Sequence, residues 1–194
     1  MGEMAQKISK VDHEELLKVL NMAFAEEWLA YYQYWVGAQV AVGPMRTSIV
    51  EEFMEHANEE LKHAKWLSDR IIQLGGTPVL DPKDWESIAQ CRYDAPNEPY
   101  VMNLLKQNLV AERCAVARYQ GICEMCFGKD YDTYRVSAKI LKEELEHEQE
   151  MGDFKQLVTG EYGGIGAYIR QRNEKGNVMI IEPFEGMPAA EAGL

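Results

Sequence analysis

The sequence predicts an all-α protein, a bundle of four long helices in which one long connection joins two helical hairpins. Two observations predict this class. Apolar residues recur at spacings of three and four over four long stretches, as an α-helix with one buried face requires. Glycine and proline separate the stretches, with tight breaks after the first and third and a long break after the second. A four-helix bundle with one long crossover has this pattern.

The first hairpin occupies the N-terminal half of the chain. Its first helix is expected to begin at Asp12, which forms a capping-box pattern with Glu15, and to end before the Gly-Pro pair at 43–44. Its second helix is expected over 47–74, before the Gly-Gly pair at 75–76. Because the loop between them is very short, the two helices should pack antiparallel.

The crossover and the second hairpin follow. The crossover, residues 77–100, holds four prolines and an Asp-Pro pair that predicts a short helix over 83–90. Long helices are expected over 97–128 and 130–160.

The predicted domain boundary falls after the last helix. We expect residues 1–160 to form the bundle and 161–194 to form a C-terminal extension, in which the apolar stretch "VMII" is typical of a short strand or a docking segment. The sequence indicates no function for this extension.

Composition excludes several classes of function. The net charge is −12 and neither end carries a basic cluster, so we expect no nucleic-acid partner. No apolar run approaches the roughly 20 residues that cross a bilayer, so we expect no membrane partner. The start "MGEMAQKISK" lacks the apolar stretch of a signal peptide, which favours a cytoplasmic location.

A short motif occurs twice. The stretches "EELKH" at 59–63 and "EELEH" at 143–147 each place a glutamate three residues before a histidine. Residues at this spacing share one helix face, so Glu60 and His63 can point at one spot, as can Glu144 and His147.

The repeat extends to the other helix of each hairpin. Glu27 lies 33 residues before Glu60, and Glu112 lies 32 residues before Glu144. Tyr34 and Tyr119 each follow the early glutamate by seven residues, two turns along the same face. A pseudo-two-fold axis would bring four carboxylates and two imidazoles together at mid-bundle, the ligand set of a carboxylate-bridged di-iron or di-manganese site. Iron or manganese suits this set, with zinc as a competitor.

Two other interpretations remain open at this point. The six residues can instead form a buried salt-bridge network. A solvated acidic face explains Glu59, Glu143, Glu146 and Glu148, and His13 and His56 are expected on polar faces. A solvated face does not explain Glu27 and Glu112, because their neighbours in the sequence are apolar. Burying a carboxylate on such a face is costly unless a positive charge compensates it.

The quoted segments resemble the ferritin-like superfamily over about residues 12–155. "LNMAFAEEWLAYYQY" is similar to the first helix of bacterioferritins, which implies Glu27 as a terminal ligand and Tyr34 beside the site. "EELKHAKWLSDRIIQLGGTPVL" is similar to their second helix, which implies a bridging Glu60 and a ligating His63. "NLVAER" and "EELEHE" fit the third and fourth helices. Tyr119 then occupies the position in the second hairpin that Tyr34 occupies in the first.

One difference from the bacterioferritins and one further resemblance narrow the choice within this superfamily. Bacterioferritins bind haem through a methionine directly after the bridging glutamate, where this chain has Leu61, so no haem is expected. "AQCRYDAP", "AERCAVARYQGIC" and "FGKDYDTY" resemble the thioferritins of the Dps-like branch, which are dodecameric cages with a cysteine pair near the metal site. The resemblance implies a ferroxidase and iron store that uses hydrogen peroxide, or less efficiently dioxygen, and protects against oxidative stress.

The same resemblance implies that the cysteine pair is Cys91 and Cys114. Cys114 is two residues past Glu112 and therefore about 200° around the helix, facing away from the metals, where it can meet the crossover. We expect a reversible disulfide that does not ligate metal. Cys123 and Cys126 are expected to be buried as small apolar residues.

Two alternative functions are retained. One is a solitary di-metal enzyme, a rubrerythrin-like peroxidase or a manganese catalase, although the tail lacks the paired Cys-x-x-Cys motifs of a rubredoxin module. The other is a DNA-compacting shell protein, against which the missing basic tail argues.

Overall fold

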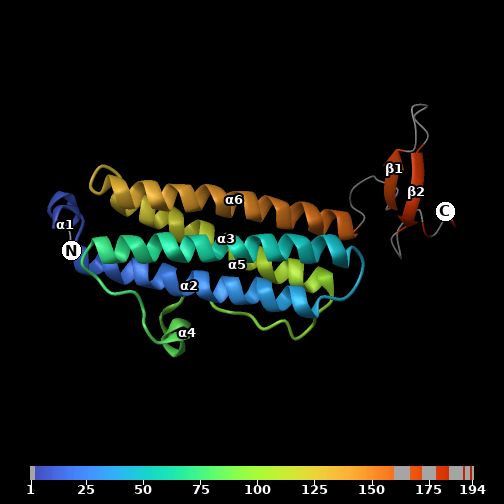
Figure 1. Cartoon of the computed structure of the whole chain (residues 1–194), viewed down its shortest axis with the longest axis horizontal. Coiled ribbons are helices and arrows are strands. Elements are labelled where there is room, and N and C mark those ends of the chain that lie inside the picture. The colour runs from blue at the N-terminus through green and yellow to red at the C-terminus, as the bar shows by residue number, and fades with distance from the viewer. Residues whose placement is uncertain (1–2, 160–166, 172–177, 184–189, 191–192, 194) are drawn as a thin grey trace.

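Four long helices form an elongated bundle in the computed structural model, which describes residues 3–159, 167–171, 178–183, 190 and 193 (Figure 1). The helices are α2 (His13–Val40), α3 (Arg46–Gln73), α5 (Val101–Cys126) and α6 (Tyr131–Thr159). α2 packs on α3 as one antiparallel hairpin, and α5 packs on α6 as the second. The predicted fold class is confirmed.

Short elements flank and connect the bundle. They are α1 (Met4–Ile8), the 3-10 helix η1 (Pro82–Asp84), α4 (Trp85–Ile88), β1 (Ala167–Gln171) and β2 (Val178–Pro183). The predicted crossover helix is therefore present as η1 and α4, and it is shorter than expected. The two strands pair antiparallel, and β2 contains the "VMII" stretch, so the strand alternative was correct for that segment.

The helix ends follow local chemistry. The Asp12 side chain accepts a hydrogen bond of 2.9 Å from the backbone N–H of Glu15, as the capping pattern predicted. The prediction that the third long helix begins near residue 97 was wrong, because α5 begins at Val101. The residues before it pair with the α2–α3 loop instead, where Val42 N–H donates to the Pro99 carbonyl at 2.9 Å.

A glycine makes this pairing possible. Gly43 has φ +118°, and a Cβ there would lie 2.7 Å from the ring of Tyr100. The loop between the first two helices therefore packs directly on the end of the crossover. Both hairpins are fastened to each other at this end of the bundle.

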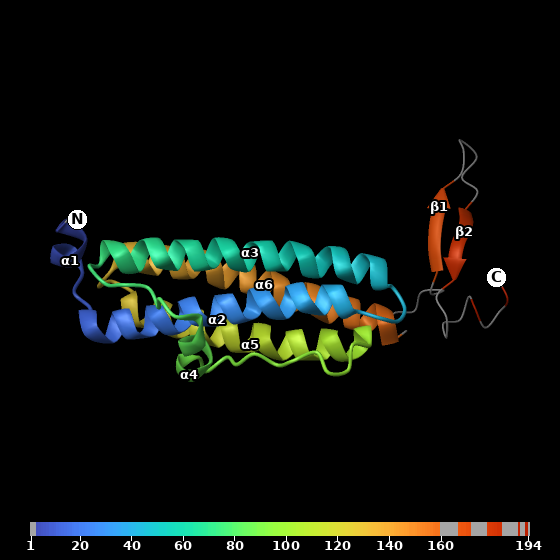
Figure 2. The same cartoon turned by 60° about the horizontal axis from the view of Figure 1, so that its bottom comes forward.

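The middle of the crossover lies along α2 and α5 (Figure 2). Glu26 Oε1 on α2 accepts hydrogen bonds from the backbone N–H groups of Gln90 at 2.8 Å and Cys91 at 3.0 Å. Arg118 Nε on α5 lies 2.8 Å from Glu26 Oε2. A disulfide joins Cys91 to Cys114 of α5, with their α-carbons 5.7 Å apart. The crossover is thus fixed to both helices that it covers.

Two apolar clusters fill the bundle interior, one toward each end. The first includes Leu20, Leu67 and Ile122, and the second includes Phe53, Leu105 and Met151. Buried polar side chains occupy the space between them. None of the helices in the described part of the chain is long and apolar enough to cross a membrane.

Candidate metal centre

Six buried side chains from all four long helices converge at the middle of the bundle. α2 supplies one glutamate, α5 supplies one glutamate, and α3 and α6 each supply a glutamate and a histidine three residues later: Glu27, Glu112, Glu60, His63, Glu144 and His147. Each is at most 3% exposed. The structure therefore brings together every residue of the predicted ligand set. Burying so many ionisable groups is costly unless charges of opposite sign meet them.

The six residues form two overlapping groups of possible metal ligands. One group contains Glu27 and His63, the other contains Glu112 and His147, and both contain Glu60 and Glu144. Within each group, one ligand atom per residue lies within 4.8 Å of all the others. The two shared carboxylates stand where they can bridge two cations.

The half around His63 is drawn tightly together. His63 Nδ1 lies 3.0 Å from Glu144 Oε1, 3.2 Å from Glu27 Oε2 and 3.2 Å from Glu60 Oε2. One ring nitrogen thus faces three carboxylates from three helices. Three oxygens and one nitrogen at a single point are a suitable set for a divalent cation.

The half around His147 is wider. His147 Nδ1 lies 3.5 Å from Glu60 Oε1, 3.7 Å from Glu112 Oε2 and 4.0 Å from Glu144 Oε2. Both His147 Nδ1 and Glu112 Oε2 are buried without a hydrogen-bond partner among the described residues. Buried polar atoms in proteins are almost always paired, so these atoms fit a bound cation.

Each histidine is oriented by a glutamate of the opposite helix. His63 Nε2 lies 2.9 Å from Glu143 Oε2 on α6, and His147 Nε2 lies 2.8 Å from Glu59 Oε2 on α3. The assignment of Glu59 and Glu143 to a purely solvated acidic face was therefore wrong. Contacts of this kind fix which ring nitrogen faces the metal.

Two buried tyrosines support the terminal carboxylates reciprocally. Tyr34 of α2 donates its hydroxyl hydrogen to Glu112 of α5, and Tyr119 of α5 donates to Glu27 of α2. Burial, and next the charge of the adjacent glutamate, raises the pKa of both phenols well above the ordinary value. Both tyrosines therefore remain protonated donors. Each hairpin supplies the hydroxyl that holds the glutamate of the other hairpin.

Protons replace metal charge in this site when no cation is bound. Burial and the nearby Glu60 raise the pKa of Glu27 to about 8, and the same two causes raise that of Glu144. Burial acts likewise on Glu60, but the adjacent imidazoles of His147 and His63 outweigh it and hold the Glu60 pKa well below its usual range. Burial opposes protonation of His147, yet the adjacent carboxylates of Glu112 and Glu60 raise its pKa to about 12. Cation binding must displace these protons.

His56 was missed by the sequence prediction. Its side chain is 1% exposed, so the expectation that it lies on a polar face was wrong, whereas His13 is half-buried. The His56 ring stacks on that of His147, with centroids 4.0 Å apart and planes 18° apart. The i, i+4 spacing between His56 and Glu60 was the available signal.

A small cavity reaches the four glutamates of the site, but neither histidine, from the side that the crossover covers. Its volume is about 30 Å³, enough for one or two water molecules, and its lining includes Glu27, Glu112 and Cys91. Cys114 is not among its lining residues. The disulfide therefore borders the route to the site without facing the ligands. Cys123 and Cys126 are free and buried, as predicted.

A four-helix bundle with a mid-bundle set of four glutamates and two Glu-x-x-His motifs defines the ferritin-like class of di-metal carboxylate proteins. Sequence comparison agrees, because the profile of the ferritin-like domain matches residues 17–159. The chain belongs to the ferritin-like family.

Individual relatives place it within the family. It is 41% identical over 157 residues to a DNA protection during starvation protein of Pyrococcus furiosus, covering 79% of this chain and 82% of the relative. It resembles the structure of a dodecameric, bacterioferritin-related thioferritin from Bacteroides fragilis, with 48% identity, a TM-score of 0.81, and coverage of 84% of this chain and 98% of the other. The Dps of Thermosynechococcus elongatus shares the fold at 19% identity, with a TM-score of 0.69 and coverage of 73% and 90%. The chain is a Dps-like member related to thioferritins.

Proposed function

We propose that this chain is a ferroxidase that binds two Fe(II) ions as substrates between Glu60 and Glu144 and oxidises them with hydrogen peroxide, or less efficiently with dioxygen. The observation that carries the proposal is the pair of overlapping ligand groups that share those two carboxylates. Glu27 with His63, and Glu112 with His147, are the terminal ligands of the two ions. The oxygen-rich set with one nitrogen per ion favours iron or manganese, and zinc competes.

The reaction balances with one peroxide for two irons. Each Fe(II) gives up one electron, the O–O bond of hydrogen peroxide breaks, and two protons complete two water molecules. The chain contributes by position and charge. Tyr34 and Tyr119 hold the terminal carboxylates, and Glu59 and Glu143 hold the imidazoles with Nδ1 inward. Haem has no place in this proposal, because Leu61 occupies the position of the haem-binding methionine.

Storage requires an assembly. A single bundle packed with two apolar clusters has little room for mineral, so we propose a cage of many copies that receives the Fe(III) and removes both reagents of hydroxyl-radical chemistry. The similarity to a thioferritin described as dodecameric supports twelve copies. Light scattering of the purified protein measures this. A monodisperse monomer or dimer would favour the rubrerythrin-like peroxidase or manganese catalase instead.

A shell that compacts DNA is a competing function, because one relative is named for DNA protection. The net charge of −12 opposes it, since binding to phosphates requires basic groups that release counterions. We therefore propose protection by removal of iron and peroxide, without nucleic acid as a partner. A gel-shift assay with linear DNA tests this point, and retardation at physiological salt would contradict it.

The test of the metal centre is the double substitution Glu60→Ala and Glu144→Ala. Rapid peroxide-driven oxidation of Fe(II) should fall by at least about 100-fold, because both shared ligands are lost, while the far-UV circular dichroism stays helical. The matched control is Glu14→Ala with Glu51→Ala, which removes the same charge at exposed positions and should oxidise normally. Undiminished initial oxidation in the first variant would refute the proposal.

A further inference from the structure

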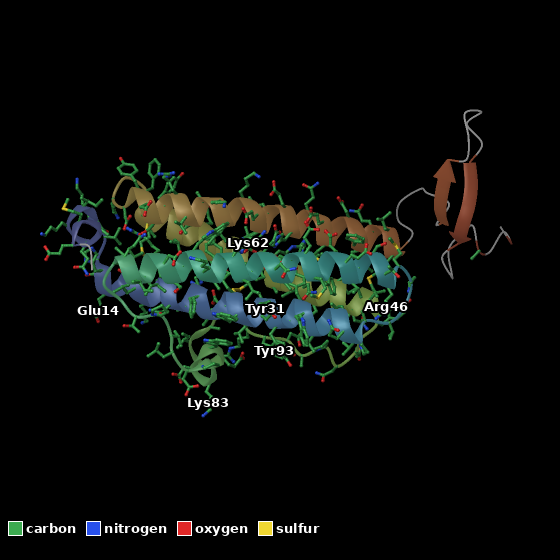
Figure 3. All side chains as sticks on the ribbon, in the orientation of Figure 1. Glu14, Tyr31, Arg46, Lys62, Lys83 and Tyr93 are labelled. Carbon is green, nitrogen blue, oxygen red and sulfur yellow. A yellow bond between two sulfur atoms is a disulfide. The ribbon has the colours of Figure 1, made fainter. Side chains whose placement is uncertain are left out.

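A second cavity, on the opposite side of the bundle from the crossover, opens between α3 and α6. Its volume is about 310 Å³, and six glutamates and two histidines line it. Figure 3 shows the two sides, with Lys62 of α3 near α6 and Tyr93 of the crossover on the other side of the bundle. Lys62 forms an ion pair with Glu59 in the lining. In the described part of the chain, no lysine or arginine forms an ion pair with Glu52 or Glu150, which also line it.

His56 lies in the lining of this acidic pocket and holds two of its carboxylates. His56 Nε2 lies 3.0 Å from Glu150 Oε2 and 3.5 Å from Glu52 Oε1. The three residues offer ligand atoms within 4.8 Å of one another. An imidazole nitrogen with two carboxylate oxygens is a common half-shell for a divalent transition-metal ion, and water completes such a shell at an open site.

The other nitrogen of the same ring points to the role of this group. His56 is 1% exposed, yet its Nδ1 has no hydrogen-bond partner among the described residues. The ring also belongs to a second group, in which His56, Glu112 and His147 offer ligand atoms within 4.8 Å of one another. One buried imidazole therefore joins the acidic pocket to the wider half of the di-metal centre.

The pseudo-symmetry of the bundle shows that a helix pair can pack at this place without the polar residues Glu52, His56 and Glu150. A shift of 84 residues carries Glu60 to Glu144 and His63 to His147. The same shift carries Glu52 to Val136 and His56 to Ile140, which is fully buried in an apolar cluster. It relates Glu150 to Trp66, whose ring lies 5.6 Å from the His63 ring and is covered by Lys139 Nζ at 3.6 Å. The equivalent place beside His63 carries a surface hollow of about 540 Å³ that is lined by Trp66, Val136 and Lys139 and does not reach His63.

We propose that His56, Glu52 and Glu150 bind a third divalent cation, and that this site passes cations between the acidic pocket and the di-metal centre through His56. Six glutamates raise the local concentration of cations at one opening of the bundle. The ion then needs to move only from one face of the His56 ring to ligands that already lie beside that ring. The site takes first-row divalent ions such as Fe(II), Co(II) and Zn(II).

The experiment measures the binding of Co(II), which does not turn over, by calorimetry and by anomalous diffraction from crystals of the full assembly. The wild type should bind three ions per chain, with the third at His56 Nε2. Glu52→Gln with Glu150→Gln should bind two, because both carboxylates of the third site are lost. The matched control Glu55→Gln with Glu146→Gln removes the same charge from the same pocket and should still bind three. Two ions in the wild type, or loss of the third ion from both double variants, would overturn the site.

A stopped-flow measurement tests the passage. The absorption of Co(II) at the di-metal centre should develop about tenfold more slowly in Glu52→Gln with Glu150→Gln than in the control pair, because both pairs weaken electrostatic focusing equally and only the first removes the ligands of the relay. Equal filling rates would overturn the passage. These outcomes are separate from the ferroxidase proposal, since a filled His56 site beside an empty di-metal centre would refute that proposal and leave this inference standing.

Discussion

The surroundings of His63 and of His147 differ although the two histidines occupy equivalent places in the two hairpins. Each follows a shared glutamate by three residues, presents Nδ1 to the centre and receives a glutamate of the opposite helix on Nε2. Beside His63, Trp66 lies under Lys139, and the surface hollow at these two residues does not include His63. Beside His147 it is open to an acidic pocket that contains His56.

This difference shows that the placement of the ligands and the surroundings of each histidine are set by different residues. The duplicated Glu-x-x-His motif places the ligands, and it does so equally in both halves. The residues one and two turns before each shared glutamate differ between the halves: they are His56 and Glu52 in the first hairpin, and Ile140 and Val136 in the second. The tighter distances around His63 and the wider ones around His147 follow the same division.

Substitutions at the equivalent positions His56 and Ile140 test this difference between the hairpins most directly. Ile140→Ala should lower the free energy of unfolding of the metal-free protein by about 2–5 kcal/mol, because it leaves a cavity in a packed cluster. His56→Ile, which copies the second hairpin into the first, should change it by less than about 1 kcal/mol, since Nδ1 has no partner and Nε2 contacts only carboxylates that water in the open pocket can solvate. Urea unfolding followed by circular dichroism measures both. Equal losses would mean that His56 is a packing residue.

The crossover is the next asymmetry, because it covers only the α2–α5 side. Replacing Cys91 and Cys114 with serine should lower the free energy of unfolding by about 3 kcal/mol, the effect expected for releasing a loop of 23 residues. Reductant should lower the stability of the wild type by the same amount and leave that of the double variant unchanged. If reductant destabilised both proteins equally, the effect would come from elsewhere in the chain.

Tyr34 and Tyr119 test a feature in which the two hairpins should be equivalent, namely the hydrogen bond to the terminal glutamate. Tyr34→Phe and Tyr119→Phe each leave a buried glutamate without its hydroxyl donor, at an expected cost of about 1–3 kcal/mol in unfolding free energy. The two values should agree within the error of chemical denaturation. A large cost in only one variant would show that the reciprocal bonds are not equivalent.

The bundle and the six central residues could be predicted because both leave periodic signals. Helical spacing of apolar residues reports a buried face, and a repeated i, i+3 pair of glutamate and histidine reports a common target. The early glutamates Glu27 and Glu112 stood out because their neighbours are apolar. The start of α5 was misplaced because Tyr100 forms a β-bridge with Val42 of a distant loop, and no local pattern reports such pairing.

The residues around the site were harder to predict because they depend on distances between helices. Glu59 and Glu143 are partly exposed, and each contacts the histidine of a helix that is far away in sequence. His56 stands among Glu52, Glu55 and Glu59, so its surroundings in the sequence look solvated. Burial in an acidic pocket and exposure to water produce the same pattern of charged residues in one sequence.

The reciprocal tyrosine contacts make each hairpin complementary to a second copy of itself. A hairpin that carries Glu, Tyr seven residues later and Glu-x-x-His cannot satisfy its own first glutamate, because the hydroxyl that reaches it comes from the opposite hairpin. Two copies of one hairpin related by a two-fold axis would complete the whole network with no further residue. In symmetry terms, one chain thus contains the isologous contact of a two-fold dimer, with the crossover as its covalent link. The covalent link also allows the two halves to differ, as His56 and Ile140 show.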